Sequence, residues 1–113
     1  MSRGEDSTLL ARRAYLIVDS RRRIALSSSR VRIGRARDND IVIDDPRVSR
    51  HHLELRWQAE LERFLAVDLN SSGGTLLNGH PIRQCTLEAG DVLLLGGSAA
   101  LVYSEVPAEL DNL

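Results

Sequence analysis

Short apolar runs separated by polar clusters recur along almost the whole chain. In several runs apolar and polar side chains alternate, which places the apolar ones on one face of an extended strand. Residues 53–57 give the clearest case: we expect the two leucines and Trp57 to point inward, and Glu54 and Arg56 to point outward. The same pattern predicts strands at residues 14–18, 24–26, 31–33, 41–43, 53–57, 64–69, 75–77, 81–82, 92–95 and 99–104.

Residues 53–65 leave one alternative open, since their leucines and charges would also fit an amphipathic helix. Trp57, Phe64 and Val67 favour strands instead. No stretch of the chain shows a long 3.6-residue period closed by capping residues. Many short strands with regular turn signals predict an all-β fold, a sandwich of two twisted, mainly antiparallel sheets.

A chain of 113 residues is large enough for one domain with its own core. We expect that domain at residues 14–105, with tails at 1–13 and 106–113. Residues 1–6 are polar and charged, unlike a signal peptide, and no apolar run is long enough to cross a membrane. The single cysteine, Cys85, excludes an intrachain disulfide and fits a reduced compartment such as the cytoplasm.

Arginine supplies all 15 basic residues, and these are unevenly distributed. Residues 1–50 carry 12 arginines and 7 acidic residues, whereas residues 51–113 carry 3 arginines and 9 acidic residues. The planar guanidinium group suits two parallel hydrogen bonds to a phosphate. A basic first half would also steer an acidic or phosphorylated ligand toward the protein.

Four short polar clusters lie between the predicted strands: Gly34-Arg35, residues 49–52 (Ser-Arg-His-His), residues 70–75 (Asn-Ser-Ser-Gly-Gly-Thr) and Asn78-Gly79. Such residues usually occupy turns and loop tips. Connections between short strands can meet at one end of a β-sandwich. A fixed arginine beside serine hydroxyls and glycine amides would supply the donors that a phosphate group needs.

The order and spacing of these clusters resemble the forkhead-associated (FHA) domain family, whose members bind phosphothreonine peptides. The resemblance extends from about Tyr15 to Tyr103. It implies a sandwich of about eleven strands and a signalling adaptor that reads Ser/Thr kinase phosphorylation. The implied partners are phosphothreonine-containing proteins, with no cofactor, nucleic acid or membrane involved.

The resemblance also assigns roles to individual residues. The phosphopeptide-binding positions would be Arg35, Ser49, Arg50, Ser72 and Gly73, and the structural support would come from Gly34, His52, Gly74, Thr75, Asn78 and Gly79. Gly73 departs from the family, which usually has an asparagine there to hold the main chain of the ligand. Replacing Gly73 by asparagine is therefore expected to strengthen binding. Thr8, which follows Glu5 and Asp6, is a candidate phosphorylation site whose phosphate would occupy this site or that of a neighbouring molecule.

The sequence leaves one alternative function open and argues against several others. The departure at Gly73 keeps open a degenerate FHA fold with phosphate-independent contacts. The few aromatic residues and the negative net charge argue against nucleic-acid binding. No nucleophile–base pair indicates an enzyme. The adjacent His51 and His52 would point to opposite faces of a strand and cannot easily share a metal ion.

Overall fold

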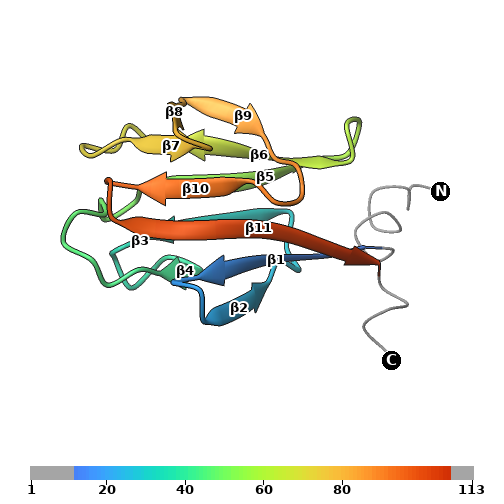
Figure 1. Ribbon diagram of the computed structural model, residues 1–113, viewed down its shortest axis with the longest axis horizontal. Helices are drawn as coiled ribbons and strands as arrows, with labels where there is room; N and C mark the ends of the chain where they lie inside the picture. Colours follow the sequence, from blue (N-terminus) through green and yellow to red (C-terminus); the bar gives the residue numbers. More distant parts are fainter. Residues whose placement is uncertain (1–11, 108–113) are drawn as a thin grey trace.

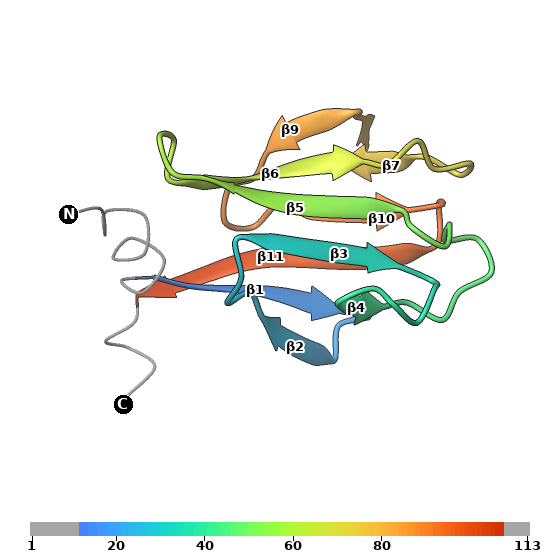
Figure 2. The same cartoon turned by 180° about the vertical axis from the view of Figure 1, so that it is seen from behind.

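The computed structural model describes residues 12–107, which form eleven strands in two stacked sheets (Figures 1 and 2). The first sheet has the order β2 (Arg22–Ala25), β1 (Arg12–Val18), β11 (Ala99–Pro107), β10 (Val92–Leu95), β7 (Thr75–Leu77) and β8 (His80–Pro81). The second has the order β4 (Ile41–Val42), β3 (Arg30–Gly34), β5 (Leu53–Gln58), β6 (Arg63–Asp68) and β9 (Gln84–Thr86). Every neighbouring pair is antiparallel except β3 and β4.

The predicted all-β sandwich is confirmed. β5 and β6 form an antiparallel hairpin, so residues 53–65 are strands and not an amphipathic helix. The strand missed by the pattern is β9, a segment Gln-Cys-Thr that pairs with β6. Its three residues are too few to show alternation. No helix able to cross a membrane occurs in the part of the chain that the structure describes.

Alternating side chains build the core between the two sheets. Val31 and Ile33 of β3 are buried, as are Leu53 and Leu55 of β5, and the polar side chains between them point to the outer face. Burial of such aliphatic side chains stabilises the fold by roughly 1.5–3 kcal/mol each. The inward and outward assignment made from the sequence therefore holds for these strands.

Glu54 points outward from β5 and is nevertheless buried. It lies on the outer face of β5, yet its exposed fraction is only 4%. Arginine side chains from β3 and from β5 itself cover its carboxylate. The outward orientation predicted for Glu54 is confirmed, and its burial follows because neighbouring long side chains can cover a residue on the open face of a sheet.

The two ends of the described chain lie side by side. Arg12 pairs with Pro107 in the register of β1 and β11. Figure 1 places this pair at the opposite end of the sandwich from the β3–β4, β4–β5, β6–β7 and β10–β11 connections. The domain limits 14–105 remain a prediction, and Thr8 lies outside the described residues.

Three aromatic rings fill part of the core. Phe64 has no exposed surface and makes edge-on contacts with Trp57, at 5.1 Å between ring centroids, and with Tyr103, at 6.2 Å. Both rings contact Phe64, which is therefore central to the interface between the sheets.

We expect Phe64→Ala to lower the free energy of unfolding by about 3–5 kcal/mol, because it removes a buried ring and leaves a cavity. Chemical denaturation followed by circular dichroism measures this change. Leu61→Ala is the matched control, since Leu61 is 57% exposed and should change stability very little. Equal effects of the two substitutions would contradict the central packing role of Phe64.

Candidate functional site

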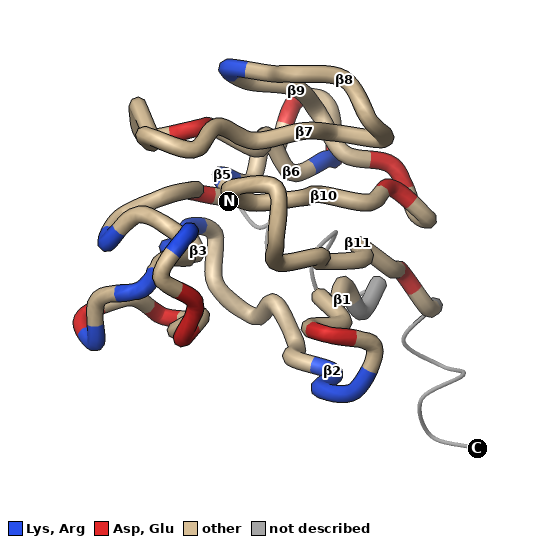
Figure 3. The backbone as a smooth tube through the Cα atoms, turned by 60° about the vertical axis from the view of Figure 1, so that its left-hand side comes forward, with Lys and Arg blue, Asp and Glu red and all other residues tan. Residues whose placement is uncertain are grey.

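Four connections converge at one end of the sandwich. Figure 3 turns this end toward the viewer. They are the segments between β3 and β4, β4 and β5, β6 and β7, and β10 and β11. Backbone and side-chain hydrogen bonds join these segments directly to one another. Three of the four polar clusters lie in or beside these connections.

Gly34 permits the closest contact between the first two connections. A Cβ atom on Gly34 would collide with the backbone carbonyl of Arg50. The Arg35 N–H donates to the Ser49 carbonyl at 2.9 Å, and the Ala36 N–H donates to the Arg50 carbonyl at 3.1 Å. Glycine is therefore needed at position 34 because two backbones pass in contact, and not because of a left-handed conformation.

A hydrogen bond from its Nε holds the Arg35 side chain in place. Its Nε donates to the Val48 carbonyl at 3.0 Å. Within residues 12–107 its terminal Nη groups have no hydrogen-bond partner, and the residue is exposed. The guanidinium is thus oriented while its outer edge stays available for a ligand.

Asn39 fixes the β3–β4 connection from inside. Its exposed fraction is 7%, and its Nδ2 donates to the carbonyls of Ala36 and Arg50, both at 2.7 Å. These two bonds tie the connection to itself and to the segment that carries Ser49. Asn39 lies outside the four polar clusters of the sequence, in a stretch that resembles a structural part of the FHA pattern.

His52 joins the β4–β5 and β6–β7 connections. The ring is fully buried. Its Nδ1 accepts from the Ser49 N–H at 3.0 Å, and its Nε2 donates to the Gly74 carbonyl at 2.8 Å. Because one ring nitrogen accepts while the other donates, the imidazole is neutral with its proton on Nε2. The bracing role predicted for His52 agrees with this geometry.

Asp68 organises the β6–β7 connection. Its carboxylate accepts from the Ser71 N–H at 3.0 Å, the Ser71 hydroxyl at 2.6 Å and the Thr75 hydroxyl at 2.7 Å. The Ser71 Oγ accepts in turn from the Gly74 N–H at 3.0 Å. Burial alone would raise the pKa of Asp68, but the hydrogen bonds from Ser71 and Thr75 lower it overall. Asp68 was missed from the sequence, although aspartate side chains commonly hydrogen-bond to neighbouring backbone N–H groups in turns.

The β10–β11 connection closes the remaining side. The Ser98 hydroxyl donates to Asp45 of the β4–β5 connection at 2.6 Å. A Cβ atom on Gly96 would collide with the carbonyl of Arg47, and one on Gly73 would lie 2.9 Å from the Cα of Gly96. Three connections therefore pack backbone against backbone at this point.

This packing changes the expectation for Gly73. Gly73 is not among the glycines with a positive φ, so the left-handed conformation that asparagine tolerates is not adopted. An asparagine side chain at position 73 requires Gly96 or the β6–β7 connection to move. The gain in affinity expected from Gly73→Asn is offset by that steric cost.

The predicted binding residues gather on the outer surface of these connections. The Ser72 N–H donates to the Ser49 hydroxyl at 3.1 Å, and the two hydroxyl oxygens are 3.4 Å apart. Arg35 and Arg50 are exposed on the adjoining segments, and Arg50 has no side-chain partner within residues 12–107. The surface thus combines guanidinium groups, two hydroxyls and backbone N–H groups.

Asn78 and Gly79 lie apart from this surface. They form the β7–β8 turn with φ values of 50° and 86°, as expected for an Asn-Gly hairpin turn. The Asn78 side chain bonds Asp91 and the Val92 N–H, both at 2.9 Å. The turn therefore anchors β7 to β10, which agrees with the predicted structural role.

His51 and His52 have different environments. His51 is exposed, and its Nε2 lies 3.0 Å from the Asp38 carboxylate, whereas His52 is buried. The hydrogen bond from His51 lowers the pKa of Asp38. The two imidazoles thus belong to separate interactions.

The molecule is thus a β-sandwich whose joined loops present guanidinium groups and hydroxyls at one end. A family model of the FHA domain matches residues 31–96. The chain is 43% identical over 70 residues to the FHA domain-containing protein FhaA of Mycobacterium tuberculosis, an alignment covering 62% of this chain and 13% of FhaA. It is 34% identical over 108 residues to the oxoglutarate dehydrogenase inhibitor of Corynebacterium diphtheriae, covering 92% of this chain and 73% of that protein.

A solved structure described as a structural and functional analysis of phosphothreonine-dependent FHA domain interactions superposes with a TM-score of 0.76 and 35% identity. The superposition covers 84% of this chain and 98% of that one. The chain belongs to the FHA domain family, and the resemblance inferred from its polar clusters is confirmed.

We expect Asp68→Asn to lower the free energy of unfolding at pH 7 by about 1–3 kcal/mol, because it removes a charged acceptor of three hydrogen bonds. Since the folded pKa of Asp68 is below its ordinary value of 3.8, this stabilisation is complete well above pH 3.8 and is lost as the pH falls through the folded pKa. Urea titrations of both proteins from pH 7 to pH 2.5 measure the difference. Asp44→Asn, on an exposed residue, is the control. If the difference in free energy of unfolding between the original protein and the Asp68→Asn variant does not shrink in acid, this account is contradicted.

Proposed function

We propose that this chain is a phosphothreonine-peptide binding module that reads proteins phosphorylated by a Ser/Thr kinase. The observation that carries the proposal is the fixed guanidinium of Arg35, whose outer edge is available on the surface that also bears Ser49 and Ser72. A phosphate at neutral pH carries a charge near −2 and three acceptor oxygens. Membership of the FHA family, and the phosphothreonine-dependent interactions described for a similar structure, support this assignment.

Each polar group would have a separate part in holding the phosphate. The Arg35 Nη groups would donate two parallel hydrogen bonds. The Ser49 Oγ already accepts from the Ser72 N–H, so its own hydrogen is available to donate to a phosphate oxygen. The hydroxyl of Ser72 would donate a further bond. Hydrogen bonds to charged groups stabilise by roughly 1.5–3 kcal/mol each, and ordering costs reduce the sum to that of a reversible binder.

The flanking residues would contact the rest of the peptide. Arg50 is exposed beside Ser49 and would meet acidic groups next to the phosphothreonine. Gly73 has no side chain, so it would contribute through its backbone alone. Gly34, His52, Gly74 and Thr75 would act by holding the loops in place.

We further propose that the module is non-catalytic and acts in the cytoplasm. The relative from Corynebacterium diphtheriae is named an inhibitor of an enzyme, which supports a non-catalytic role. Phosphothreonine written by intracellular kinases, together with a single free cysteine, fits a reducing compartment.

We expect Arg35→Ala to weaken binding of a phosphothreonine peptide by more than about a hundredfold, because two charge-assisted hydrogen bonds are lost. Arg35→Lys should also bind poorly, since an ammonium cannot reproduce the guanidinium fork. Isothermal titration calorimetry with a matched phosphorylated and unphosphorylated peptide measures both. For all forms, affinity should fall below about pH 6, where the phosphate gains a proton.

Arg63→Ala is the matched control, because Arg63 is exposed and begins β6, at the end of that strand opposite the β6–β7 connection. Unchanged affinity in folded Arg35→Ala would refute the assignment of the phosphate site. If the unphosphorylated peptide binds as tightly as the phosphorylated one, the phosphate-independent FHA function replaces the proposal.

A further inference from the structure

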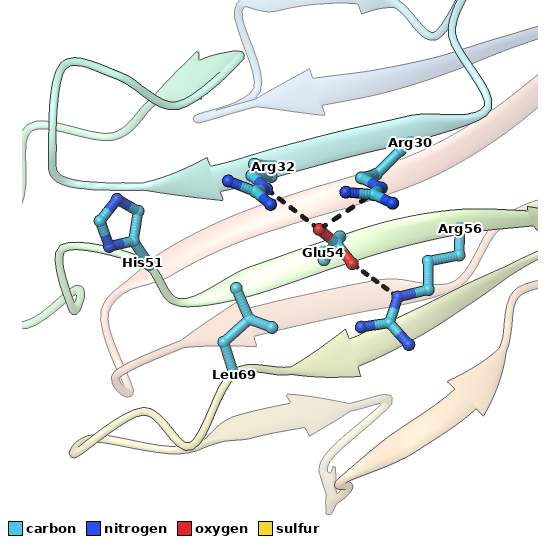
Figure 4. Close-up of a pocket in the computed structure, with 6 residues that line it drawn as sticks. All are labelled: Arg30, Arg32, His51, Glu54, Arg56 and Leu69. Atoms are coloured by element: carbon cyan, nitrogen blue, oxygen red, sulfur yellow. Dashed lines mark hydrogen bonds and ion pairs between the residues drawn. The ribbon is translucent and has the colours of Figure 1, made fainter.

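Three arginines surround one buried carboxylate on the outer face of the second sheet (Figure 4). Arg30 and Arg32 come from β3, and Glu54 and Arg56 come from β5. The side chains of Arg30, Arg32 and Arg56 are 62%, 49% and 46% exposed. The side chain of Glu54 is only 6% exposed. The cluster therefore presents positive groups to solvent and hides its negative group beneath them.

Glu54 fixes the orientation of these arginines. Its carboxylate accepts from the Nε of Arg32 at 3.1 Å and from the Nε of Arg56 at 2.5 Å, and the Nε of Arg30 lies 4.0 Å away. Within residues 12–107 the terminal Nη groups of all three have no hydrogen-bond partner. The guanidinium edges are thus oriented in advance and remain available, which reduces the ordering cost of binding an anion.

Within the cluster itself, the positive charge of the arginines exceeds the negative charge of Glu54. Burial alone would raise the pKa of Glu54, but the hydrogen bonds from Arg56 and Arg32 lower it overall, so the carboxylate stays charged. Three guanidinium groups and one carboxylate leave an excess of two positive charges. The Asp38 and Asp40 carboxylates lie toward the β3–β4 connection, where Asp40 accepts the Arg32 N–H. The guanidinium of Arg30, 4.0 Å from Glu54, is therefore the least compensated, and Arg30 is paired with Arg56 across β3 and β5.

An open cavity of about 430 Å³ joins this cluster to the loops of the phosphate site. Besides the four residues of the cluster, His51 and Leu69 line it. His51 follows Arg50, and Leu69 precedes Asn70, so the cavity begins where the β4–β5 and β6–β7 connections meet the sheet. Figure 4 shows His51 and Leu69 on one side of the arginines. The cavity therefore adjoins the segments that carry Arg50 and Asn70.

Aliphatic side chains border the cluster. Phe64 and Ala66 of β6 point inward, which places Leu65 and Val67 on the outer face, opposite Arg56 and Glu54 in the register. An open sheet face usually carries polar residues at such positions. The outward positions of β3, β5 and β6 hold no aromatic residue on which a nucleic-acid base could stack. The face therefore suits a protein segment that contains both carboxylates and aliphatic side chains.

We propose that the surface formed by Arg30, Arg32 and Arg56, together with the aliphatic residues of β6, binds an acidic segment of the same phosphorylated partner whose phosphothreonine occupies the loops. This inference rests on the proposed function. From Gly34 to Arg30 the strand covers about 13 Å. A flexible connection of about six residues spans that distance, and the tethered segment would add affinity through its effective concentration.

Two synthetic peptides test the proposal by calorimetry. The first carries phosphothreonine with neutral flanks, and the second adds a six-residue Gly-Ser linker and the segment Glu-Leu-Glu-Leu-Glu, placed after or before the phosphothreonine in separate syntheses. We expect the extended peptide to bind at least about fivefold more tightly in one placement. Arg30→Gln/Arg56→Gln should reduce this gain to less than about twofold while leaving the short peptide unaffected.

Control variants separate binding from folding. Arg83→Gln, an exposed arginine outside the surface, should keep the full gain. The single variant Arg30→Gln should lose part of the gain without a change in thermal unfolding, since the Arg30 Nε lies 4.0 Å from Glu54 and is exposed. Loss of the gain only in variants that unfold more easily would overturn the proposal.

Three other outcomes would overturn it as well: no gain in either placement, a gain that survives Arg30→Gln/Arg56→Gln, or stronger binding of an oligouridylate than of the acidic peptide at these arginines. If the short peptide does not bind, the proposed function fails first. The unphosphorylated acidic segment alone is then tested by NMR. Shifts at the amides of Arg30 and Arg56 support the surface, and their absence refutes it.

Discussion

The imidazole of His52 holds together the two connections on which the rest of the site depends. It is fully buried, accepts from the Ser49 N–H and donates to the Gly74 carbonyl. Only a neutral ring with its proton on Nε2 can do both. Ser49 and Ser72 face each other because this ring sets the spacing of their two segments. A buried side chain thus determines where the two hydroxyls of the proposed phosphate site lie.

Glycine contacts supply the second constraint. Gly34 and Gly96 bring backbones to distances that any Cβ atom would prevent. The loops are therefore packed against one another as closely as elements of the core are. Asp68 and Asn39 then satisfy the polar groups that this packing encloses, through hydrogen bonds of 2.6–3.0 Å. A site built from connections can in this way be preorganised without regular secondary structure.

The sequence predicted the sandwich because strand alternation and turn residues are local signals. Val31, Ile33 and Asn78-Gly79 each behave as their immediate neighbours in the chain indicate. The polar clusters marked the connections between strands for a similar reason, since their residue types usually occupy turns and loop tips.

The features that the sequence did not predict depend on contacts between distant residues. Glu54 is buried by Arg32, which lies 22 positions earlier. Asn39 becomes a loop brace only because the carbonyl of Arg50 is brought to its amide. The steric limit at Gly73 comes from Gly96, on a different connection. No pattern within a single segment contains this information, which becomes available only once the strands are placed.

The pairing of Arg12 with Pro107 determines how far the loops lie from the point where the chain enters the first sheet. β11 has nine residues and extends from that pair to the loop end, a distance of about 30 Å. Thr8 precedes Arg12 by four residues, which cover at most about 14 Å when fully extended. A phosphate on Thr8 would therefore fall short of the loops of its own domain and could be bound only by a second molecule. Any such contact would depend on protein concentration and would link molecules into assemblies instead of closing one domain upon itself.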